Sequence, residues 1–267
     1  MKIYLNGDLT DKEKLEELLE PGFLFGWGVF ETLRTYQTKI PFLAEHTKRL
    51  NNSLKLLGLE EAKQDWEKII KNLLSINSLK DAYVRITAYK KRSTTGLIIY
   101  ADKFSYYNAT TYEKGMKALV SSQVRYPKDI CSKVKSISYL QNRISWLEAQ
   151  KAKKDEALLL NPERFLAGGS RSNLFLVRDK KIYTPLVEDG AFDGITKRVI
   201  KDIAESLDLV VKEKSLTTKD LFNCEEAFIT STLMEVMPLV ECNDKKIGKG
   251  IPGEITFKIL SEYRKML

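Results

Sequence analysis

Hydrophobic and polar positions recur with two different periods along the chain, and each period predicts one kind of element. Apolar side chains repeat every three to four residues over 42–57 and 61–74, which predicts two amphipathic helices. Segments rich in β-branched and aromatic residues predict strands, at 2–6, 29–36, 82–91, 96–104, 116–124 and 157–160. The pair Asn6 and Gly7, which ends the first of these strands, is typical of a hairpin turn.

The C-terminal half continues this mixture of strands and helices. Strands are predicted at 180–185 and 210–216, and helices from about Thr196, at 217–222 and at 253–267. We expect the segment 225–241 to be a strand that runs into a turn. Mixed β segments and helices in two unequal halves predict an α+β (mixed α/β) fold with two domains.

The boundary between the two domains is predicted from a change in pattern after residue 122. The segment that follows the strand at 116–124 carries a proline and mixed charges, and it has no clear period. We therefore expect an N-terminal domain over 1–122, a connection over 123–129 and a C-terminal domain over 130–267.

Composition removes several classes of function. The longest apolar runs are too short to span a bilayer, and the polar, acidic start is unlike a signal peptide. Cys131, Cys224 and Cys242 show no CxxC spacing, and His46 is the sole histidine, so we predict a cytoplasmic protein without a metal site. The net charge of +8 comes from dispersed lysines rather than a basic stripe, so we expect neither nucleic-acid nor membrane binding.

Three features are compatible with an anion site. Gly194-Ile195-Thr196 enters a predicted helix, whose first N–H groups can bind a phosphate. Thr230-Ser231-Thr232 adds hydroxyl groups at the end of a strand, and Arg49 lies on a helical face from which it could grip a phosphate with two hydrogen bonds. Each feature alone is common in proteins without such a site. Lys135 is similarly ambiguous, because it could be a surface charge or an amine that forms a Schiff base.

Seven segments together carry a resemblance to a known family. They occur in that family's order and cover nearly the whole chain, at 25–36, 42–53, 135–140, 155–161, 168–177, 193–200 and 225–240. The chain resembles the class IV aminotransferases, a family of pyridoxal-phosphate enzymes. This family includes branched-chain and D-amino-acid aminotransferases and 4-amino-4-deoxychorismate lyase.

The resemblance implies a fold, a cofactor and an assembly. The larger C-terminal domain would be β-barrel-like with helices, the N-terminal domain would be a smaller α/β unit, and two copies would form a homodimer. The cofactor would be pyridoxal 5'-phosphate. Lys135 matches the family's Schiff-base lysine and is thus the implied catalytic residue, whereas Lys133 fits the family pattern less well.

Further residues acquire implied roles from the same resemblance. The residues implied to bind the cofactor are Arg49, Lys135, Tyr139, Gly168, Ser172, Asn173, Ile195, Thr196, Ser231 and Thr232. The residues implied to contact a small amino- and carboxylate-bearing substrate are Phe30, Lys90, Leu233 and Met234.

The chain departs from the family pattern at two positions. Gly168 stands where the family has a glutamate that pairs with the pyridine nitrogen and keeps the ring an electron sink. Lys90-Lys91 stands where members often have Arg-Gly, and a lysine attracts a carboxylate without the fork of an arginine.

The resemblance supports one main reaction and two alternatives. The stretch LMEVMP at 233–238 is similar to the corresponding turn of aminodeoxychorismate lyases, so the expected reaction converts 4-amino-4-deoxychorismate to 4-aminobenzoate and pyruvate. The first alternative is transfer of an amino group between a branched-chain or D-amino acid and a 2-oxoacid. The second is a catalytically weak or non-catalytic relative, in which Gly168 marks lost chemistry.

Overall fold

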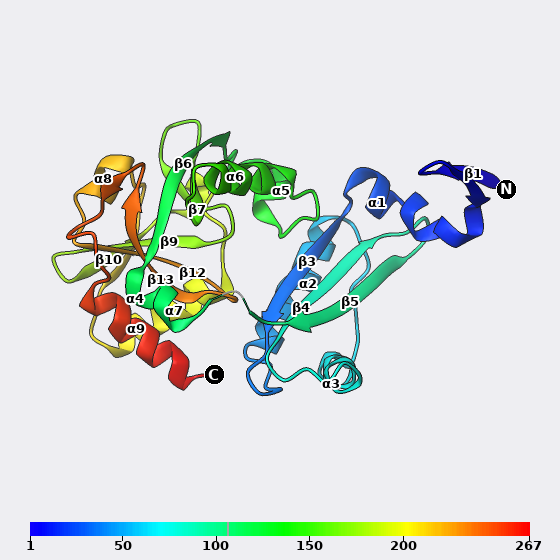
Figure 1. Ribbon diagram of the computed structural model, residues 1–267, viewed down its shortest axis with the longest axis horizontal. Coiled ribbons are helices and arrows are strands. Elements are labelled where there is room, and N and C mark those ends of the chain that lie inside the picture. The colour runs from blue at the N-terminus through cyan, green and yellow to red at the C-terminus, as the bar shows by residue number, and fades with distance from the viewer. Residues whose placement is uncertain (106) are drawn as a thin grey trace.

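The computed structural model describes residues 1–105 and 107–267, and their strands form three sheets. Two strands form a hairpin at the N-terminus, three form a small sheet, and nine form a large sheet. Figure 1 shows the large sheet and its helices on one side of the molecule, the small sheet on the other, and the hairpin extending beyond the small sheet. The fold is the expected mixed α+β class.

The N-terminal hairpin has the predicted turn. β1 (Lys2–Leu5) pairs with β2 (Asp8–Asp11), and Asn6 and Gly7 connect them with positive φ angles of 49° and 111°. A 3₁₀ segment, η1 (Lys12–Leu19), and a short helix, α1 (Pro21–Phe25), then lead into the small sheet. The sequence pattern did not predict α1.

The small sheet is antiparallel and carries its own apolar core. Its order is β3 (Gly28–Arg34), β4 (Ala82–Lys90), β5 (Thr95–Lys103). The two predicted helices are α2 (Leu43–Leu56) and α3 (Trp66–Ile76). Their apolar faces join the sheet in one buried cluster, which includes Leu50, Leu54, Ile70, Leu74, Val84 and Ile86.

The large sheet has the order β11-β10-β9-β12-β13-β6-β7-β8, and β14 also pairs with β13. It contains both parallel and antiparallel neighbours, and it curls into a barrel-like surface. The bounds of its strands are β6 (Met116–Val124), β7 (Glu156–Leu160), β8 (Leu166–Gly169), β9 (Asn173–Arg178), β10 (Lys181–Thr184), β11 (Val211–Glu213), β12 (Glu226–Ser231), β13 (Glu235–Cys242) and β14 (Lys245–Lys246).

Helices surround this sheet. They are α4 (Ala109–Lys114), α5 (Ile130–Lys133), α6 (Leu140–Lys151), the 3₁₀ turn η2 (Val187–Asp189), α7 (Ile195–Ser206), α8 (Thr218–Phe222) and α9 (Glu254–Lys265). α6 packs on β6 and β7, whereas α7 and α9 pack against each other and against β12. The apolar side of α7 and the stacked rings of Phe175 and Phe228 lie in the larger core.

Three predictions about elements need correction. The helix expected from residue 61 begins at Trp66, because the side chain of Asp65 accepts a hydrogen bond from the Lys68 N–H and caps the helix there. The segment 225–241 is a hairpin of two strands, β12 and β13, rather than one strand and a turn. The connection predicted at 123–129 conflicts with the pairing of β6, because β6 lies between β13 and β7 in the large sheet. We therefore propose a division before Met116 instead.

Two contacts fix the small sheet against the large part of the chain. The N–H of Phe30 on β3 donates to the Lys135 carbonyl at 2.8 Å, and the N–H of Ile137 donates to the Gly28 carbonyl at 3.0 Å. The segment around Lys135 thus extends the open edge of the small sheet. Elsewhere the buried carboxylate of Glu235 accepts from Arg34 and from Arg264, which joins β3, β13 and α9.

None of the helices among the described residues has both the length and the apolar character required to cross a bilayer. The cytoplasmic location stays a prediction.

Candidate active site

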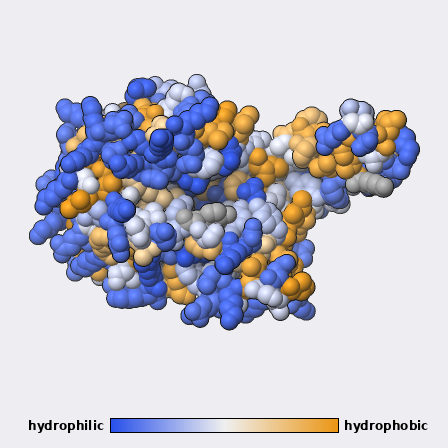
Figure 2. All heavy atoms as spheres, in the orientation of Figure 1, coloured by the Kyte–Doolittle hydropathy of each residue, from blue (hydrophilic) through white to orange (hydrophobic). Residues whose placement is uncertain are grey.

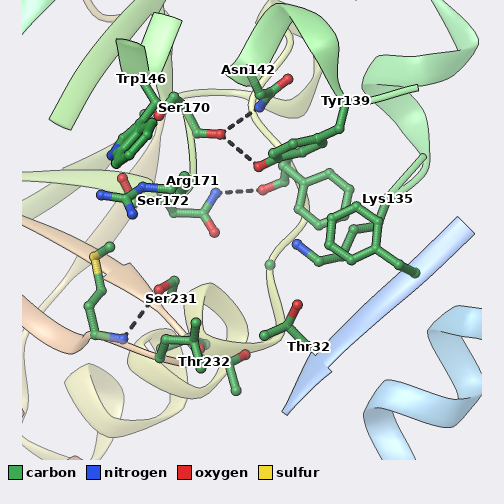
Figure 3. A pocket seen from close by; sticks show the side chains of 18 of the residues that line it. Thr32, Lys135, Tyr139, Asn142, Trp146, Ser170, Arg171, Ser172, Ser231 and Thr232 are labelled. Carbon is green, nitrogen blue, oxygen red and sulfur yellow. Dashed lines mark hydrogen bonds between the residues drawn. The ribbon is translucent and has the colours of Figure 1, made fainter. Parts of the chain in front are cut away.

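A cavity of about 750 Å³ lies where the two parts of the chain meet. Its walls come from β3, β4 and α2 on one side and from α6, the turn after β8, the start of α7 and the β12–β13 turn on the other. The volume is in the range of sites that enclose a small molecule. Figure 3 shows Lys135 and Tyr139 facing this space from one side, with Ser231 and Thr232 at another.

The Lys135 side chain is held in the cavity by its backbone and by aromatic rings. Its carbonyl is bonded to β3, as described above, so the residue cannot shift along the strand edge. The amine lies 4.6 Å from the centre of the Phe30 ring and 5.7 Å from that of Phe192. Lys133 is exposed and does not line the cavity.

The environment of this amine favours its neutral form. Burial lowers the pKa of Lys135 from 10.5 to about 8, and the positive charges of Arg49 and Arg85 lower it further, although Glu31 acts in the opposite sense. A neutral amine is a nucleophile and a proton acceptor, whereas an ammonium group is neither. A substantial fraction of Lys135 is therefore competent near neutral pH.

One end of the cavity, which we call the anion end, contains Arg49, Ile195, Thr196, Ser231 and Thr232. Ile195 and Thr196 begin α7, where unpaired backbone N–H groups and the helix dipole favour a negative charge. Ser231 ends β12 and Thr232 begins the following turn, so two hydroxyl groups lie at the same end. A Cβ on Gly194 would collide with the Asn173 side chain, so glycine permits this close approach at the start of the helix.

Arg49 is oriented by a buried carboxylate. Its Nε and Nη2 each donate to Glu31 at 2.7 Å, one to each carboxylate oxygen. His46 Nδ1 lies 2.7 Å from Glu31 Oε2, and His46 Nε2 lies 3.5 Å from Thr232 Oγ1. Burial opposes the charge on Glu31, but the hydrogen bonds from Arg49 and His46 outweigh it and lower the pKa of Glu31 to about 2. Burial likewise lowers the pKa of His46 despite the adjacent carboxylate, so His46 is neutral and connects Glu31 to Thr232.

The opposite end, which we call the ring end, is built around the turn that follows β8. The Ser170 carbonyl accepts from Tyr139 at 2.8 Å and from Asn142 at 2.5 Å, as Figure 3 shows. Behind the turn, the buried carboxylate of Glu156 accepts from the Ser170 hydroxyl at 2.5 Å and from the Ser172 hydroxyl at 2.9 Å. These bonds fix the turn on both sides.

Gly168 does not line the cavity but sets the path of this turn. Its φ of 99° lies in the region that favours glycine, and a Cβ there would lie 3.0 Å from the Ser172 carbonyl oxygen. A glutamate could not replace it without a change in the backbone. Glycine at this position is thus matched to the local structure.

The cavity brings together most of the residues singled out from the sequence. Those that line it are Phe30, Arg49, Lys135, Tyr139, Ser172, Asn173, Ile195, Thr196, Ser231, Thr232, Leu233 and Met234. Lys90 does not, and its selection as a substrate residue was wrong because it lies at the far end of β4. The residue of β4 that does face the cavity is Arg85, five positions earlier.

Sequence reasoning missed three groups that shape the site. Arg85 lies with its guanidinium 3.7 Å from the centre of the Phe30 ring and donates to Thr87 at 3.2 Å. Glu31 and His46 orient Arg49. The alternation of β4 could have indicated Arg85, because Tyr83, Arg85 and Thr87 share one face of that strand.

Comparison with known proteins agrees with this geometry. The family model described as amino-transferase class IV matches residues 28–242. The chain belongs to this family. A branched-chain-amino-acid aminotransferase of Pseudomonas aeruginosa is 30% identical over 98% of this chain and 91% of that protein. An aminodeoxychorismate lyase of Bacillus subtilis is 28% identical over 98% of this chain and 94% of that protein.

A solved structure extends the similarity to three dimensions. The branched-chain amino acid aminotransferase of T.th., solved with pyridoxamine 5'-phosphate, superposes with a TM-score of 0.87 and 30% identity, over 99% of this chain and 93% of the other. Class IV aminotransferases use pyridoxal 5'-phosphate, and this chain is such a pyridoxal-phosphate enzyme.

The residues of the cavity fit that cofactor. The anion end offers a helix N-terminus, an oriented arginine and hydroxyl groups, which is the donor set that a phosphate requires. Lys135 offers an amine of lowered pKa for the aldehyde.

Proposed function

We propose that this enzyme transfers an amino group between a branched-chain amino acid and a 2-oxoacid. The similarity to branched-chain aminotransferases in sequence and in structure favours this reaction over the lyase reaction expected from the LMEVMP stretch. The observation that carries the proposal is the position of the Lys135 amine between the anion end and Arg85. One group on each side can therefore hold a negative charge while the amine acts between them.

The roles of the residues follow from their positions. Arg49, the first turn of α7 and the hydroxyl groups of Ser231 and Thr232 would hold the cofactor phosphate. Bound pyridoxal phosphate would link covalently to amino groups and withdraw electrons from the carbon that loses its proton. The Lys135 amine would hold the cofactor and would accept and return that proton, which requires the neutral form that its surroundings favour.

Arg85 would receive the carboxylate of the substrate. A guanidinium can donate two parallel hydrogen bonds to a carboxylate, and its position on the Phe30 ring restricts its orientation. Phe30, Leu233 and Met234 supply apolar surface near the same space, which suits an aliphatic side chain.

A panel of substrates tests this function. Purified enzyme loaded with pyridoxal phosphate should convert leucine, isoleucine or valine to the matching 2-oxoacid, with 2-oxoglutarate as acceptor. D-alanine in the same panel separates branched-chain from D-amino-acid transfer. Failure to transfer any amino group, with release of pyruvate and 4-aminobenzoate from aminodeoxychorismate, would show that the enzyme is a lyase.

The lyase reaction stays the second candidate because of the charge of the cavity. Besides Arg49 and Lys135, the cavity is lined by Arg85, Arg125, Arg143 and Arg171, against the acidic side chains of Asp102 and Asp129. Such an excess of cations suits a substrate with two carboxylates, as aminodeoxychorismate has.

We also propose that two copies of the chain form a homodimer. Figure 2 shows apolar side chains on the surface around α1, and the exposed residues there are Phe23, Leu24, Phe25 and Trp27. A cluster of exposed large apolar residues indicates an interaction surface. Sedimentation analysis should give twice the mass of the chain, and the mass of a single chain at all concentrations would refute the dimer.

A further inference from the structure

Arg125 is a buried cation whose backbone is fixed at the ring end of the cavity. It directly follows β6, and its N–H donates to the Leu160 carbonyl at 2.8 Å, which continues the pairing of β6 with β7. Only 6% of the residue is exposed, yet its side chain lines the cavity. The guanidinium therefore faces the interior of the site rather than solvent.

The stem of Arg125 passes beside the residue that precedes Gly168. A Cβ built on Gly190 would lie 2.9 Å from Arg125 Cγ and 3.6 Å from Ala167 Cβ. Gly190 has a φ of 96°, so a residue without a side chain both allows that backbone and leaves room for the arginine stem. Arg125 is thus directed along β8 towards the turn that forms the ring end.

Two donors of this guanidinium lack a partner. Nε and Nη2 of Arg125 are buried and make no hydrogen bond with any residue that the structure describes. A buried donor left without an acceptor costs about 1–3 kcal/mol, and more when the group is charged. The neighbours that act on Arg125 electrostatically are Tyr139 and Glu156, but the oxygens of Glu156 bond to the serines of the turn instead. Arg125 therefore needs an acceptor that enters the cavity.

Other possible acceptors lie elsewhere in the site. The anion end has its own arginine, helix start and hydroxyl groups for a phosphate. Arg85 on β4 is placed for a substrate carboxylate. What Arg125 faces is the end of the cavity beside Tyr139 and the β8 turn, where position 168 offers no acidic side chain because it is a glycine.

We infer that Arg125 donates a hydrogen bond to the ring nitrogen of bound pyridoxal phosphate and holds that nitrogen unprotonated. The inference rests on the cofactor within the proposed function but not on the choice of substrate. An arginine is always a donor, so the nitrogen beside it must be an acceptor. The fixed charges nearby, Arg125 itself and Lys135, Arg49 and Arg85 across the cavity, disfavour a further proton on the ring.

The protonation of the ring nitrogen can be observed directly. Enzyme reconstituted with ¹⁵N-labelled pyridoxal phosphate should show, by ¹⁵N NMR, a bound resonance in the range of an unprotonated pyridine from pH 6 to pH 9. A resonance in the protonated range at pH 7 would overturn the inference while leaving the cofactor assignment intact. Absence of any bound resonance and of any absorbance from the bound cofactor would overturn both.

Variants assign the effect to Arg125. Arg125→Met should raise the pKa of the ring nitrogen by about 1 unit or more, because a neighbouring positive charge is removed. Arg125→Lys keeps the charge and should keep the nitrogen unprotonated, which serves as a second variant if the methionine variant does not fold. Arg178→Met removes an arginine at the end of β9 and should change nothing. A resonance that is the same in Arg125→Met and in wild type would overturn the role of Arg125, whatever the amino-transfer activity.

Discussion

The two ends of the cavity differ in how their polar groups are paired. At the anion end, the buried Glu31 accepts both hydrogen bonds of the Arg49 fork and a third from His46. At the ring end, Arg125 Nε and Nη2, Arg171 Nε and Trp146 Nε1 are buried without a hydrogen-bond partner among the described residues. One end is held by the protein itself, and the other depends on what binds.

This difference separates two tasks. An arginine held by a buried carboxylate loses little conformational freedom when a phosphate arrives, so the anion end can anchor one common group with little reorganisation. Donors without protein partners instead select a ligand by the acceptors that it presents, because a mismatched ligand leaves them unsatisfied. We therefore expect the anion end to govern stability and cofactor affinity, and the ring end to govern chemistry.

The largest expected effect comes from the amine that lies between the two ends. Lys135→Ala should abolish covalent attachment of pyridoxal phosphate and lower the amino-transfer rate by roughly 10³-fold or more, because it removes both the nucleophile and the proton acceptor. The measurement is the absorbance of the bound cofactor, together with borohydride reduction followed by mass spectrometry. Reduction should fix the cofactor to the wild-type chain only.

Lys133→Ala is the matched control. Lys133 is exposed and lies two residues before Lys135, so its removal should leave labelling and activity unchanged. Labelling that persists in Lys135→Ala and disappears in Lys133→Ala would assign the cofactor lysine to the alternative that the sequence left open.

The next effect concerns the carboxylate of the anion end. The pKa of Glu31 falls from 4.5 to about 2 on folding, so its charge contributes about 3 kcal/mol of stability at neutral pH. Because the folded pKa is the lower one, this contribution is present above pH 4.5 and is lost as the pH falls towards 2. Glu31→Gln should therefore lower the free energy of unfolding by about that amount at pH 7, measured by urea denaturation, and the difference should shrink in acid.

Glu45→Gln is the control for this variant. Glu45 is exposed on α2, the helix that also carries Arg49. Its replacement should change stability by less than about 0.5 kcal/mol. If Glu31→Gln were as stable as Glu45→Gln, the anion end would not be held by the protein in the way described.

The anion end was also the part most accessible to sequence reasoning. Arg49 and the helix start at Ile195 follow from helical periodicity and from the glycine before the helix, which are local patterns. The partner of Arg49 could not be predicted, since Glu31 lies on a strand eighteen residues earlier and meets Arg49 only through the packing of α2 on β3. The same holds for His46, which from composition alone only argues against a metal site.

The ring end depends on sheet register, and there the sequence was a weaker guide. Lys90 was chosen on β4 by its place in a motif, but the side chain that faces the cavity is decided by the strand alternation and by its pairing with β3, which select Arg85. Arg125 was assigned to a connection because β6 was expected to end the first domain. The hairpin of β12 and β13 was missed because its turn, at 232–234, contains neither glycine nor proline, and Glu235 after it adopts a positive φ of 55°.

The smallest effect is a shift in the pH dependence of cofactor attachment. Only the neutral amine of Lys135 attacks an aldehyde, and its pKa is lowered to about 8, so the rate of attachment to cofactor-free enzyme should rise with pH and reach half its maximum near pH 8. Arg85→Met removes a charge that lowers this pKa, and the midpoint should move upward, although burial still keeps it below 10.5. Stopped-flow absorbance between pH 6 and pH 10 measures both curves, with Arg92→Met, an exposed arginine after β4, as the matched control. Because Arg85 belongs to the small sheet and Lys135 to the segment that pairs with its edge, a shifted midpoint in Arg85→Met alone would show that the two parts of the chain tune the amine together. An unchanged midpoint would mean that burial sets the reactivity of Lys135 without help from Arg85.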